Sequence, residues 1–288
     1  MATGRKNELY LTPSFYRRTN MHSGRNVFYS SFEEKAIPEF KLDANSFFPY
    51  VNVLDDVVLK AVSEKEYEYM KFFSDKVLGG ELHNFPIVYG RGEPFEDETG
   101  IKVIVEMEKF DADYTNIDQS EQSTGETLSM YIQIFMALYS IDSFGKYHGD
   151  LNPGNVLYKT ITPEEELDSE HPGYLKYIID GETYYVKHFN TLWVIADFEL
   201  MGDKGEVLPA DVFTEQFFQR VFGELYDKID KPVRGGWLYD MFVFTKFIES
   251  SKANERIFGL MQVKSGLNPF EAIPHIIKND LSRILVKE

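Results

Sequence analysis

The 288-residue sequence contains no cysteine. This absence excludes a disulfide framework, a thiolate metal site and a cysteine nucleophile, and it fits a reducing compartment. The sequence also has no apolar run of about 18 residues, so we expect no membrane span. The first residues, Met1 to Glu8, lack the apolar core of a signal peptide. We therefore expect a cytoplasmic protein.

Basic residues are in short supply as well. The 30 Lys and Arg residues stand against 47 Asp and Glu residues, which gives a net charge of -17. Such a chain repels phosphates, so we expect no direct nucleic-acid binding, whereas a basic protein substrate is compatible with it. Solubility is the simplest role of this acidity. The first 25 residues run against the trend and are interpreted as a docking arm or a disordered leader. Their basic residues are Arg5, Lys6, Arg17, Arg18 and Arg25.

Hydrophobic residues make up 43% of the chain and aromatic residues 15%, which suffices for a well-packed globular protein. The length exceeds what one small core needs. Strand patterns dominate the first third, and helical patterns dominate the remainder. This predicts an α+β fold with a small β-rich lobe, a larger mainly helical lobe and a cleft between them. We expect an N-terminal extension over residues 1–40, a first lobe over 41–108, and a second lobe over 109–288 with a β insertion at about 159–192.

Apolar, partly β-branched runs predict the strands of the first lobe. They cover residues 27–29, 47–54, 57–62, 85–90 and 101–107. The two runs around Asp55–Asp56 indicate a hairpin, and an acidic loop from Glu93 to Thr99 joins the last two strands. A helix is predicted from Ser63, because Ser63 and Glu66 have the spacing of a capping box. Capping gives Glu66 a purely structural alternative role.

The second lobe begins with an apolar periodicity that predicts a helix over residues 127–143. Its expected inward face consists of Leu128, Ile132, Phe135, Met136 and Leu138. Short strands are predicted over residues 174–179, 183–186 and 192–196, with Asp180–Gly181 as a turn. Helices are expected at 212–226, at 237–248 and through the remainder of the chain. Glu164 to Glu166 is expected to be a solvated loop, and the following aromatic residues are expected in the core: Phe217, Phe218, Phe222, Phe242 and Phe244.

The stretch of residues 147–158 carries the spacing H-x-D-x-x-x-x-N in His148, Asp150 and Asn155. Asp150 is a carboxylate that could hold a substrate hydroxyl, and Asn155 offers a neutral oxygen suited to Mg²⁺. Because Asn152-Pro153-Gly154-Asn155 is also strong turn chemistry, a purely structural turn is the alternative. His148 is expected to brace the loop rather than to act as a base.

Further charged residues supply the other parts that phosphoryl transfer needs, namely a cation for the phosphates, a partner that aims it, and metal ligands. Lys60 ends a predicted strand, and Glu66 or Glu68 on the next helix can pair with it. Asp197 follows a predicted strand, where its carboxylate would point into the cleft. The order of these parts along the chain favours transfer of a phosphoryl group from ATP with Mg²⁺.

With these parts in this order, the sequence resembles the protein-kinase-like superfamily over roughly residues 40–250. The matching segments are Val58-Leu59-Lys60, Glu66, His148-Gly149-Asp150 through Asn155, and Asp197-Phe198-Glu199. Within the superfamily the chain is most similar to atypical Ser/Thr protein kinases of large cytoplasmic DNA viruses and to the haspin-like group. Two features carry this closer likeness, residues 84–90 and the strand pairs of 174–186 that precede residues 192–198. If the protein is viral, the expected location is the host cytoplasm or the virion.

The resemblance implies a role for each matching residue. Lys60 contacts the α- and β-phosphates of ATP and pairs with Glu66, while Asp150 orients the acceptor hydroxyl. Asn155 and Asp197 hold Mg²⁺. The backbone of residues 106–108 meets adenine, with Val105 as gatekeeper, and Asp240 supports the catalytic loop by accepting backbone N–H bonds. The implied nucleotide-binding residues are thus Val51, Lys60, Glu106, Met107, Glu108, Asn155 and Asp197.

The sequence departs from the family pattern at several points. Gly149 replaces the Arg that usually reads a phosphorylated activation loop, so we expect no activation by loop phosphorylation. Glu199 replaces the usual Gly after Asp-Phe, which removes a flexible position and adds a carboxylate near the metal. No Ala-Pro-Glu motif is present. No Gly-rich phosphate loop is recognisable either, and the candidates are Asp43 to Phe48 and Ser23 to Val27.

Three functions remain open on the sequence alone. A Ser/Thr protein kinase is favoured because Lys60, Glu66, Asp150, Asn155 and Asp197 are all present. A small-molecule kinase is the second reading, since the two site motifs also look like those of the aminoglycoside and choline kinase group. A non-catalytic pseudokinase is the third, suggested by Glu199 and the missing glycines.

Overall fold

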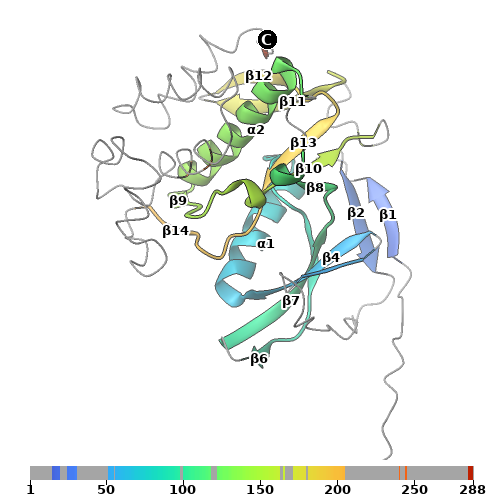
Figure 1. Ribbon diagram of the computed structural model, residues 1–288, viewed down its shortest axis with the longest axis vertical. Coiled ribbons are helices and arrows are strands. Elements are labelled where there is room, and N and C mark those ends of the chain that lie inside the picture. Colours follow the sequence, from blue (N-terminus) through green and yellow to red (C-terminus); the bar gives the residue numbers. More distant parts are fainter. Residues whose placement is uncertain are drawn as a thin grey trace, which may run out of the picture.

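The computed structural model describes a mixed α and β protein, in agreement with the predicted α+β class (Figure 1). It describes residues 15–19, 25–30, 51–54, 56–97, 100–117, 122–162, 165, 171–179, 181–204, 240, 244 and 285–287. Across these ranges, no helix is both long and apolar enough to span a membrane.

The first sheet has the strand order β3-β4-β7-β5, and β6 also pairs with β7. The strands are β3 (Val51–Val53), β4 (Val57–Ser63), β5 (Val88–Arg91), β6 (Phe95–Asp97) and β7 (Gly100–Glu108). The predicted hairpin between β3 and β4 is confirmed over its described residues. Strand β6 lies where we predicted only an acidic loop. It forms because Gly100, at φ 120°, allows a tight reversal that pairs Phe95 with Lys102.

Helix α1 (Glu64–Leu78) follows β4 directly and packs against the first sheet (Figure 1). Its N-cap is Ser63, as predicted, and the Ser63 side chain accepts a hydrogen bond from the backbone N–H of Glu66. The buried apolar side chains recur at helical spacing and face the sheet. They are Tyr67, Met70, Phe73 and Val77.

Helix α2 (Thr124–Ser143) begins with a complete capping box between Ser123 and Glu126. Residues 129–138 are buried without interruption, and β9, β12 and β13 all contact the helix. The prediction of a single inward face was therefore too narrow. Leu128, which we assigned to that face, is only half-buried.

Small sheets surround α2, in the orders β13-β10-β8, β11-β12-β15 and β14-β9. The predicted strands of this part are confirmed as β11 (Tyr174–Ile179), β12 (Glu182–Lys187) and β13 (Thr191–Ile195). The remaining elements are β8 (Ala112–Asp113), η1 (Tyr114–Asn116), β9 (Lys146–Tyr147), η3 (Pro153–Asn155), β10 (Val156–Thr160) and β14 (Gly202–Asp203). Near the end of the chain, β15 (Leu285–Lys287) is a strand rather than part of a helix, because it pairs with β12.

Two charged residues lie elsewhere than predicted. Glu165 is buried rather than part of a solvated loop, because Lys159 neutralises it at 2.7 Å. Arg25 is only 1% exposed, which corrects its assignment to a docking arm or disordered leader. It precedes β2 (Asn26–Ser30), which pairs with β1 (Phe15–Thr19).

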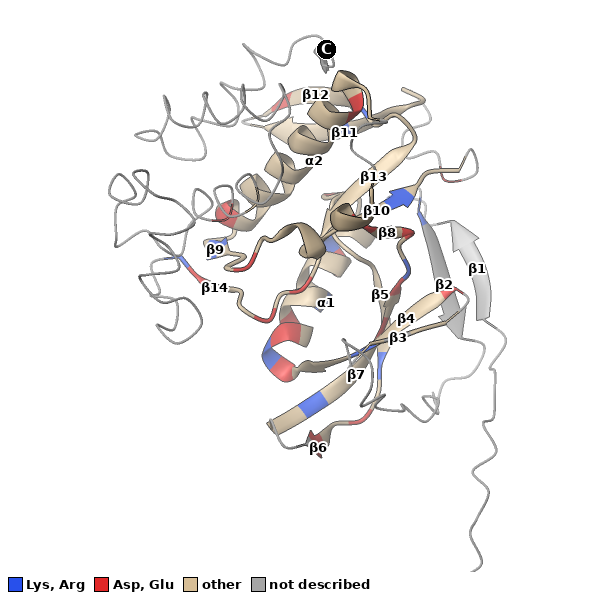
Figure 2. Ribbon diagram, in the orientation of Figure 1, with Lys and Arg blue, Asp and Glu red and all other residues tan. Residues whose placement is uncertain are grey.

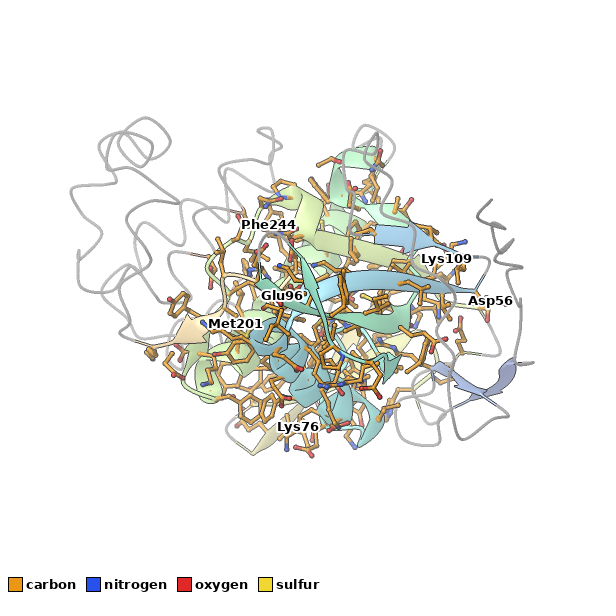
Figure 3. The ribbon with its side chains drawn as sticks, turned by 90° about the horizontal axis from the view of Figure 1, so that it is seen from below. Asp56, Lys76, Glu96, Lys109, Met201 and Phe244 are labelled. Atoms are coloured by element: carbon orange, nitrogen blue, oxygen red, sulfur yellow. The ribbon has the colours of Figure 1, made fainter. Side chains whose placement is uncertain are left out.

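Aromatic rings fill the core between the first sheet and α2. Phe73 stacks on Phe85 and on Phe198, with ring centroids 4.3 and 5.6 Å apart. Phe244 is fully buried against Tyr114 and Tyr131, as predicted for a core residue (Figure 3). Several sequence predictions fall outside the described residues. They concern Arg5, Lys6, residues 43–48, Glu164, Glu166, Asp180, Phe217, Phe218, Phe222, Phe242, and the helices at 212–226 and 237–248 except positions 240 and 244.

Candidate active site

Lys60 lies between two carboxylates that come from different parts of the chain. Its Nζ is 2.7 Å from Glu66 Oε1 on α1 and 2.8 Å from Asp197 Oδ1 just after β13. The Lys60 side chain is 21% exposed, so these ion pairs are only partly open to water. The structure thus brings together three residues that the sequence singled out, across 137 positions of chain between Lys60 and Asp197.

The two alternative roles of Glu66 separate cleanly. Its backbone N–H donates to the Ser63 cap at 3.1 Å, whereas its carboxylate turns to Lys60 and makes no return bond to the cap. Only half of the capping box therefore forms. Glu66 is preferred over Glu68 on structural grounds too, because Glu66 is buried and Glu68 is exposed.

Lys60 is shared by two carboxylates, and the pKa values of these two carboxylates shift in opposite directions. Burial raises the pKa of Glu66 to about 7, against the attraction of Lys60. Burial also acts to raise the pKa of Asp197, but the Lys60 charge outweighs it and holds that pKa below its usual range. The side chains explain the difference, since Glu66 is 4% exposed and Asp197 is 36% exposed. Burial acts to lower the pKa of Lys60, yet the two carboxylates raise it overall.

Asp150 and Asn155 face each other across a short turn. The Asn155 Nδ2 group donates to the backbone oxygen of Asp150 at 2.8 Å and to its Oδ2 at 3.2 Å. The Asn152 side chain caps η3 by accepting from Gly154 N at 2.9 Å, so the expected turn chemistry is present. This turn orients Asn155 toward Asp150. The segment can therefore be a structural turn and also carry the two proposed site residues. Burial raises the pKa of the Asp150 carboxyl.

His148 and Asp240 hold this loop in place through hydrogen bonds to its backbone. His148 Nε2 donates to the carbonyl of Ala196 at 3.0 Å, and Asp150 N donates to His148 Nδ1 at 3.3 Å. These bonds use the imidazole in its neutral form, and burial lowers the His148 pKa to about 4. Asp240 accepts the backbone N–H groups of His148 and Gly149, both at 2.8 Å. The predicted bracing roles of both side chains match these contacts.

Asn155 and Asp197 lie at the same end of one β ladder. Strands β10 and β13 pair Val156 with Ile195, and Ala196 N donates to Asn155 O at 2.9 Å. The Asn155 amide nitrogen is engaged by Asp150, which leaves Oδ1 for a cation. One carboxylate and one amide oxygen suit Mg²⁺, which usually keeps several waters and binds substrate phosphates. Within the described ranges, no three Asp, Glu or His side chains form a metal cluster.

The segment after Asp197 is packed tightly against the loop that carries Asp150. Asp197 itself has a φ of 66°, a left-handed conformation that an Asp tolerates at some cost. The ring of Phe198 is buried, and β14 pairs with β9. Gly149 has a φ of 87°, and a Cβ atom there would lie 2.6 Å from the Leu200 carbonyl oxygen. The Gly149 departure thus has a steric cause, since no larger residue fits this approach.

Glu199 adds an exposed carboxylate beside this site. Its negative charge contributes to the raised pKa values of Asp150 and Glu66, although burial is the larger cause for both. Figure 2 shows acidic positions in the first turn of α1 and in the loops that flank β9 and β14. Lys60 is therefore surrounded by several acidic groups in the described part of the site, namely Glu66, Asp150, Asp197 and Glu199.

Four of the residues predicted to line the nucleotide site, namely Val51, Lys60, Val105 and Met107, lie on one face of the first sheet. Register pairs Val51 with Lys60 and Lys60 with Val105, so these three side chains are cross-strand neighbours. Met107 lies on the same face as Val105, whereas Glu106 and Glu108 point to the opposite face and are buried. Contacts of Glu106, Met107 and Glu108 with a nucleotide stay a prediction.

Strand β7 extends further than predicted, to Glu108. Glu106 and Met107 have paired strands on both sides, and Glu108 N donates to Ile87 O at 2.8 Å. The next backbone bond is Asp111 N to Tyr158 O, so Lys109 and Phe110 lie between two ladders. Lys109 and Asp56 lie at the same end of the sheet (Figure 3). Lys109 and Phe110 are therefore the residues directly after β7 whose backbone belongs to neither ladder.

Arg25, Lys159 and Glu165 form a second buried charge cluster around Glu108, which sequence reasoning missed. No local sequence pattern predicts this cluster, because Arg25 and Glu108 are 83 positions apart. A separate cavity of about 130 Å³ between residues 81–85 and α2 contains none of the predicted site residues.

No protein-family model matches the sequence, and no curated protein matches it significantly. The functional interpretation therefore depends on the geometry around Lys60 and Asp150.

Proposed function

We propose that the chain is a phosphotransferase of the protein-kinase-like superfamily, two-lobed in fold, which uses ATP and Mg²⁺ to phosphorylate Ser/Thr hydroxyls of protein substrates. The observation that carries the proposal is the position of Lys60, within 2.8 Å of both Glu66 and Asp197. A cation held from two sides next to a metal-binding carboxylate is the arrangement that nucleotide phosphates require.

In this proposal the Lys60–Glu66 ion pair positions the cation before ATP arrives. Glu66 holds Nζ from α1, so phosphate oxygens can replace Asp197 as the second partner of Lys60. Asp197 is then available, with Asn155, to hold Mg²⁺. The bound Mg²⁺ supplies neutralisation of phosphate charge. Val51, Val105 and Met107 lie on the same face of the sheet as Lys60. Val105 and Met107 are buried in the core, whereas Val51 is half-buried, so adenine would lie against Val51.

Asp150 is proposed to hold the acceptor hydroxyl and to accept its proton during transfer. Its raised pKa favours proton acceptance, and the Asn155 amide fixes the carboxylate by the bond to Oδ2 at 3.2 Å. The acceptor oxygen forms a bond to the γ-phosphorus while the bond from that phosphorus to ADP breaks. The neutral, fully buried His148 contributes position only.

The charge of the chain favours a basic acceptor. The net charge is -17, and the exposed Glu199 adds a carboxylate close to Asp150. A basic segment next to the acceptor Ser or Thr would be attracted to this surface. Cationic small molecules would share this attraction, so an acceptor panel has to contain both classes.

Binding and transfer assays test the proposal together. ATP with Mg²⁺ should raise the thermal stability of the protein, because a ligand that binds only the folded state stabilises it. Labelled phosphate from ATP should then appear on a basic protein such as histone, and Lys60→Ala should abolish it. Transfer only to aminoglycosides or amino alcohols would establish the small-molecule alternative. Absence of any thermal shift with any nucleotide or metal would instead support a pseudokinase.

A further inference from the structure

Arg25 is a buried cation that the proposed transfer does not use. It lies directly before β2, and its guanidinium donates to the carbonyl oxygens of His83 at 2.5 Å and Phe85 at 2.7 Å. It also donates to the carboxylate of Glu108 at the end of β7. A planar guanidinium can satisfy several acceptors in fixed directions, which a lysine cannot do. Arg25 therefore ties the hairpin β1–β2 to the chain entering β5 and to the end of β7.

Glu108 extends these contacts to the second part of the molecule. Its Oε2 accepts from Ile87 N at 3.2 Å, and its Oε1 lies 3.3 Å from Lys159 Nζ. Lys159 is also 2.7 Å from Glu165, so two cations and two anions balance among the described residues of the cluster. This balance makes burial tolerable, whereas the loss of one member would leave an uncompensated charge.

The location of this cluster connects it with the candidate active site. Lys159 belongs to β10, and β10 begins directly after Asn155. Glu108 belongs to β7, which also carries Val105 and Met107 on the face shared with Lys60. A displacement of the end of β7 would therefore move the predicted adenine contacts relative to Asn155.

We infer that Arg25 is a positioning residue of the nucleotide site, which fixes the end of β7 through Glu108; this rests on the proposed function. The hairpin β1–β2 is then an internal support of the site. Arg25 touches neither nucleotide nor acceptor. Its removal should weaken nucleotide binding more than the rate of transfer at saturating nucleotide.

The test compares Arg25→Met and Arg25→Lys with Lys71→Met in the full-length chain. Lys71 is a matched control because it is an exposed cation that pairs with the exposed Asp75, at 2.6 Å. We expect Arg25→Met to raise the Kd and KM for ATP with Mg²⁺ by about tenfold or more, with a smaller change in kcat. Arg25→Lys should lie between it and the wild type, and Lys71→Met should change neither constant.

Hydrogen exchange of the backbone amides of residues 87–88 and 106–110 supplies a readout independent of activity. Exchange should be faster in both Arg25 variants and unchanged in Lys71→Met. If Arg25→Met does not fold, Arg25→Lys decides by the same two readouts. Unchanged nucleotide affinity and unchanged exchange in Arg25→Lys and any folded Arg25→Met would overturn the inference. If the wild type binds no nucleotide, the proposed function fails, and the exchange data still decide whether Arg25 fixes the end of β7.

Discussion

Gly149 is the residue at which one added methyl group should do the most damage. Its φ is 87°, and an added Cβ would lie 2.6 Å from Leu200 O and 3.2 Å from the Tyr147 ring. Gly149→Ala should therefore lower the free energy of unfolding by more than the roughly 1–3 kcal/mol of backbone strain alone. It should also reduce kcat, because the displaced backbone belongs to the loop that carries Asp150. Chemical denaturation and steady-state kinetics measure the two effects.

Gly181→Ala is the matched control for this substitution. Gly181 has a similar φ of 79°, but no atom lies within 4 Å of the position of its Cβ. The control should show only the cost of backbone strain and no loss of kcat. Equal effects of the two substitutions would contradict the close approach between Gly149 and Leu200.

His148 should make stability depend on pH in the acidic range. Burial lowers its pKa from 6.5 to about 4. The unfolded chain therefore takes up a proton below pH 6.5, while the folded protein resists it until about pH 4. The stability that depends on neutral His148 is present above pH 6.5 and is lost as the pH falls toward 4. The shift corresponds to about 3 kcal/mol.

His148→Gln isolates this contribution, because glutamine offers one donor and one acceptor but does not titrate. Urea unfolding of the wild type and the variant should be compared at pH 7 and pH 4.5. The wild type should lose about 2–3 kcal/mol more than the variant over this range. The comparison must be with the variant, because the raised pKa of Glu66 acts in the opposite direction. Parallel losses in both proteins would show that folding does not lower the pKa of His148.

At the scale of elements, the Asp240 side chain holds the loop between β9 and η3. Asp240 accepts two backbone N–H groups of that loop at 2.8 Å, so both carboxylate oxygens are used. Asp240→Asn would set an amide N–H₂ against a backbone N–H. We expect a loss of about 1–3 kcal/mol in unfolding free energy, together with a lower kcat and a nearly unchanged KM for ATP.

Asp111→Asn provides the comparison for Asp240→Asn. The carboxylate of Asp111 also accepts two bonds, from Thr160 N and Oγ1 at 2.7 Å, but this pair is exposed. Water can replace its contacts, so the change should cost little and leave kcat unaltered. If Asp240→Asn proved equally mild, Asp240 would not hold the loop in place.

Local sequence patterns predicted most of the described helices and strands. They failed where pairing with a segment distant in sequence determines the secondary structure. Apolar runs located β4 and β7, and the spacing of Ser63 and Glu66 located the start of α1. By contrast, β15 is a strand only because it pairs with β12, about 100 positions earlier. Periodicity also understated the burial of α2, since residues 129–138 are buried without interruption.

The candidate site was more predictable than the contacts that support it. Lys60, Asp150, Asn155 and Asp197 follow from residue type and order, and the structure brings them into one region. Arg25 and Glu165 were placed on the surface because single charges usually are solvated. Their burial depends on Glu108 and Lys159, and no spacing in the sequence relates these partners.

Over the whole molecule, two charge clusters join the first sheet to the part built around α2. Lys60 links β4 and α1 to Asp197, and Glu108 links β7 to Lys159 on β10. Val57 and Glu108 are opposite each other in the register of β4 and β7, so both clusters lie on the two central strands of the sheet. In the proposed function, nucleotide and acceptor would bind between these two parts of the molecule.

Transfer of labelled phosphate from ATP by the wild type and by Asp150→Asn is the most direct test of this account. Asparagine keeps the shape of Asp150 and an oxygen for the Asn155 amide, but it cannot accept the proton of the acceptor. We predict transfer to basic protein by the wild type with Mg²⁺ and a loss of about 10²- to 10⁴-fold in Asp150→Asn. Nucleotide affinity should be unchanged. Equal transfer rates in the two proteins would contradict the assignment of Asp150 and of this site.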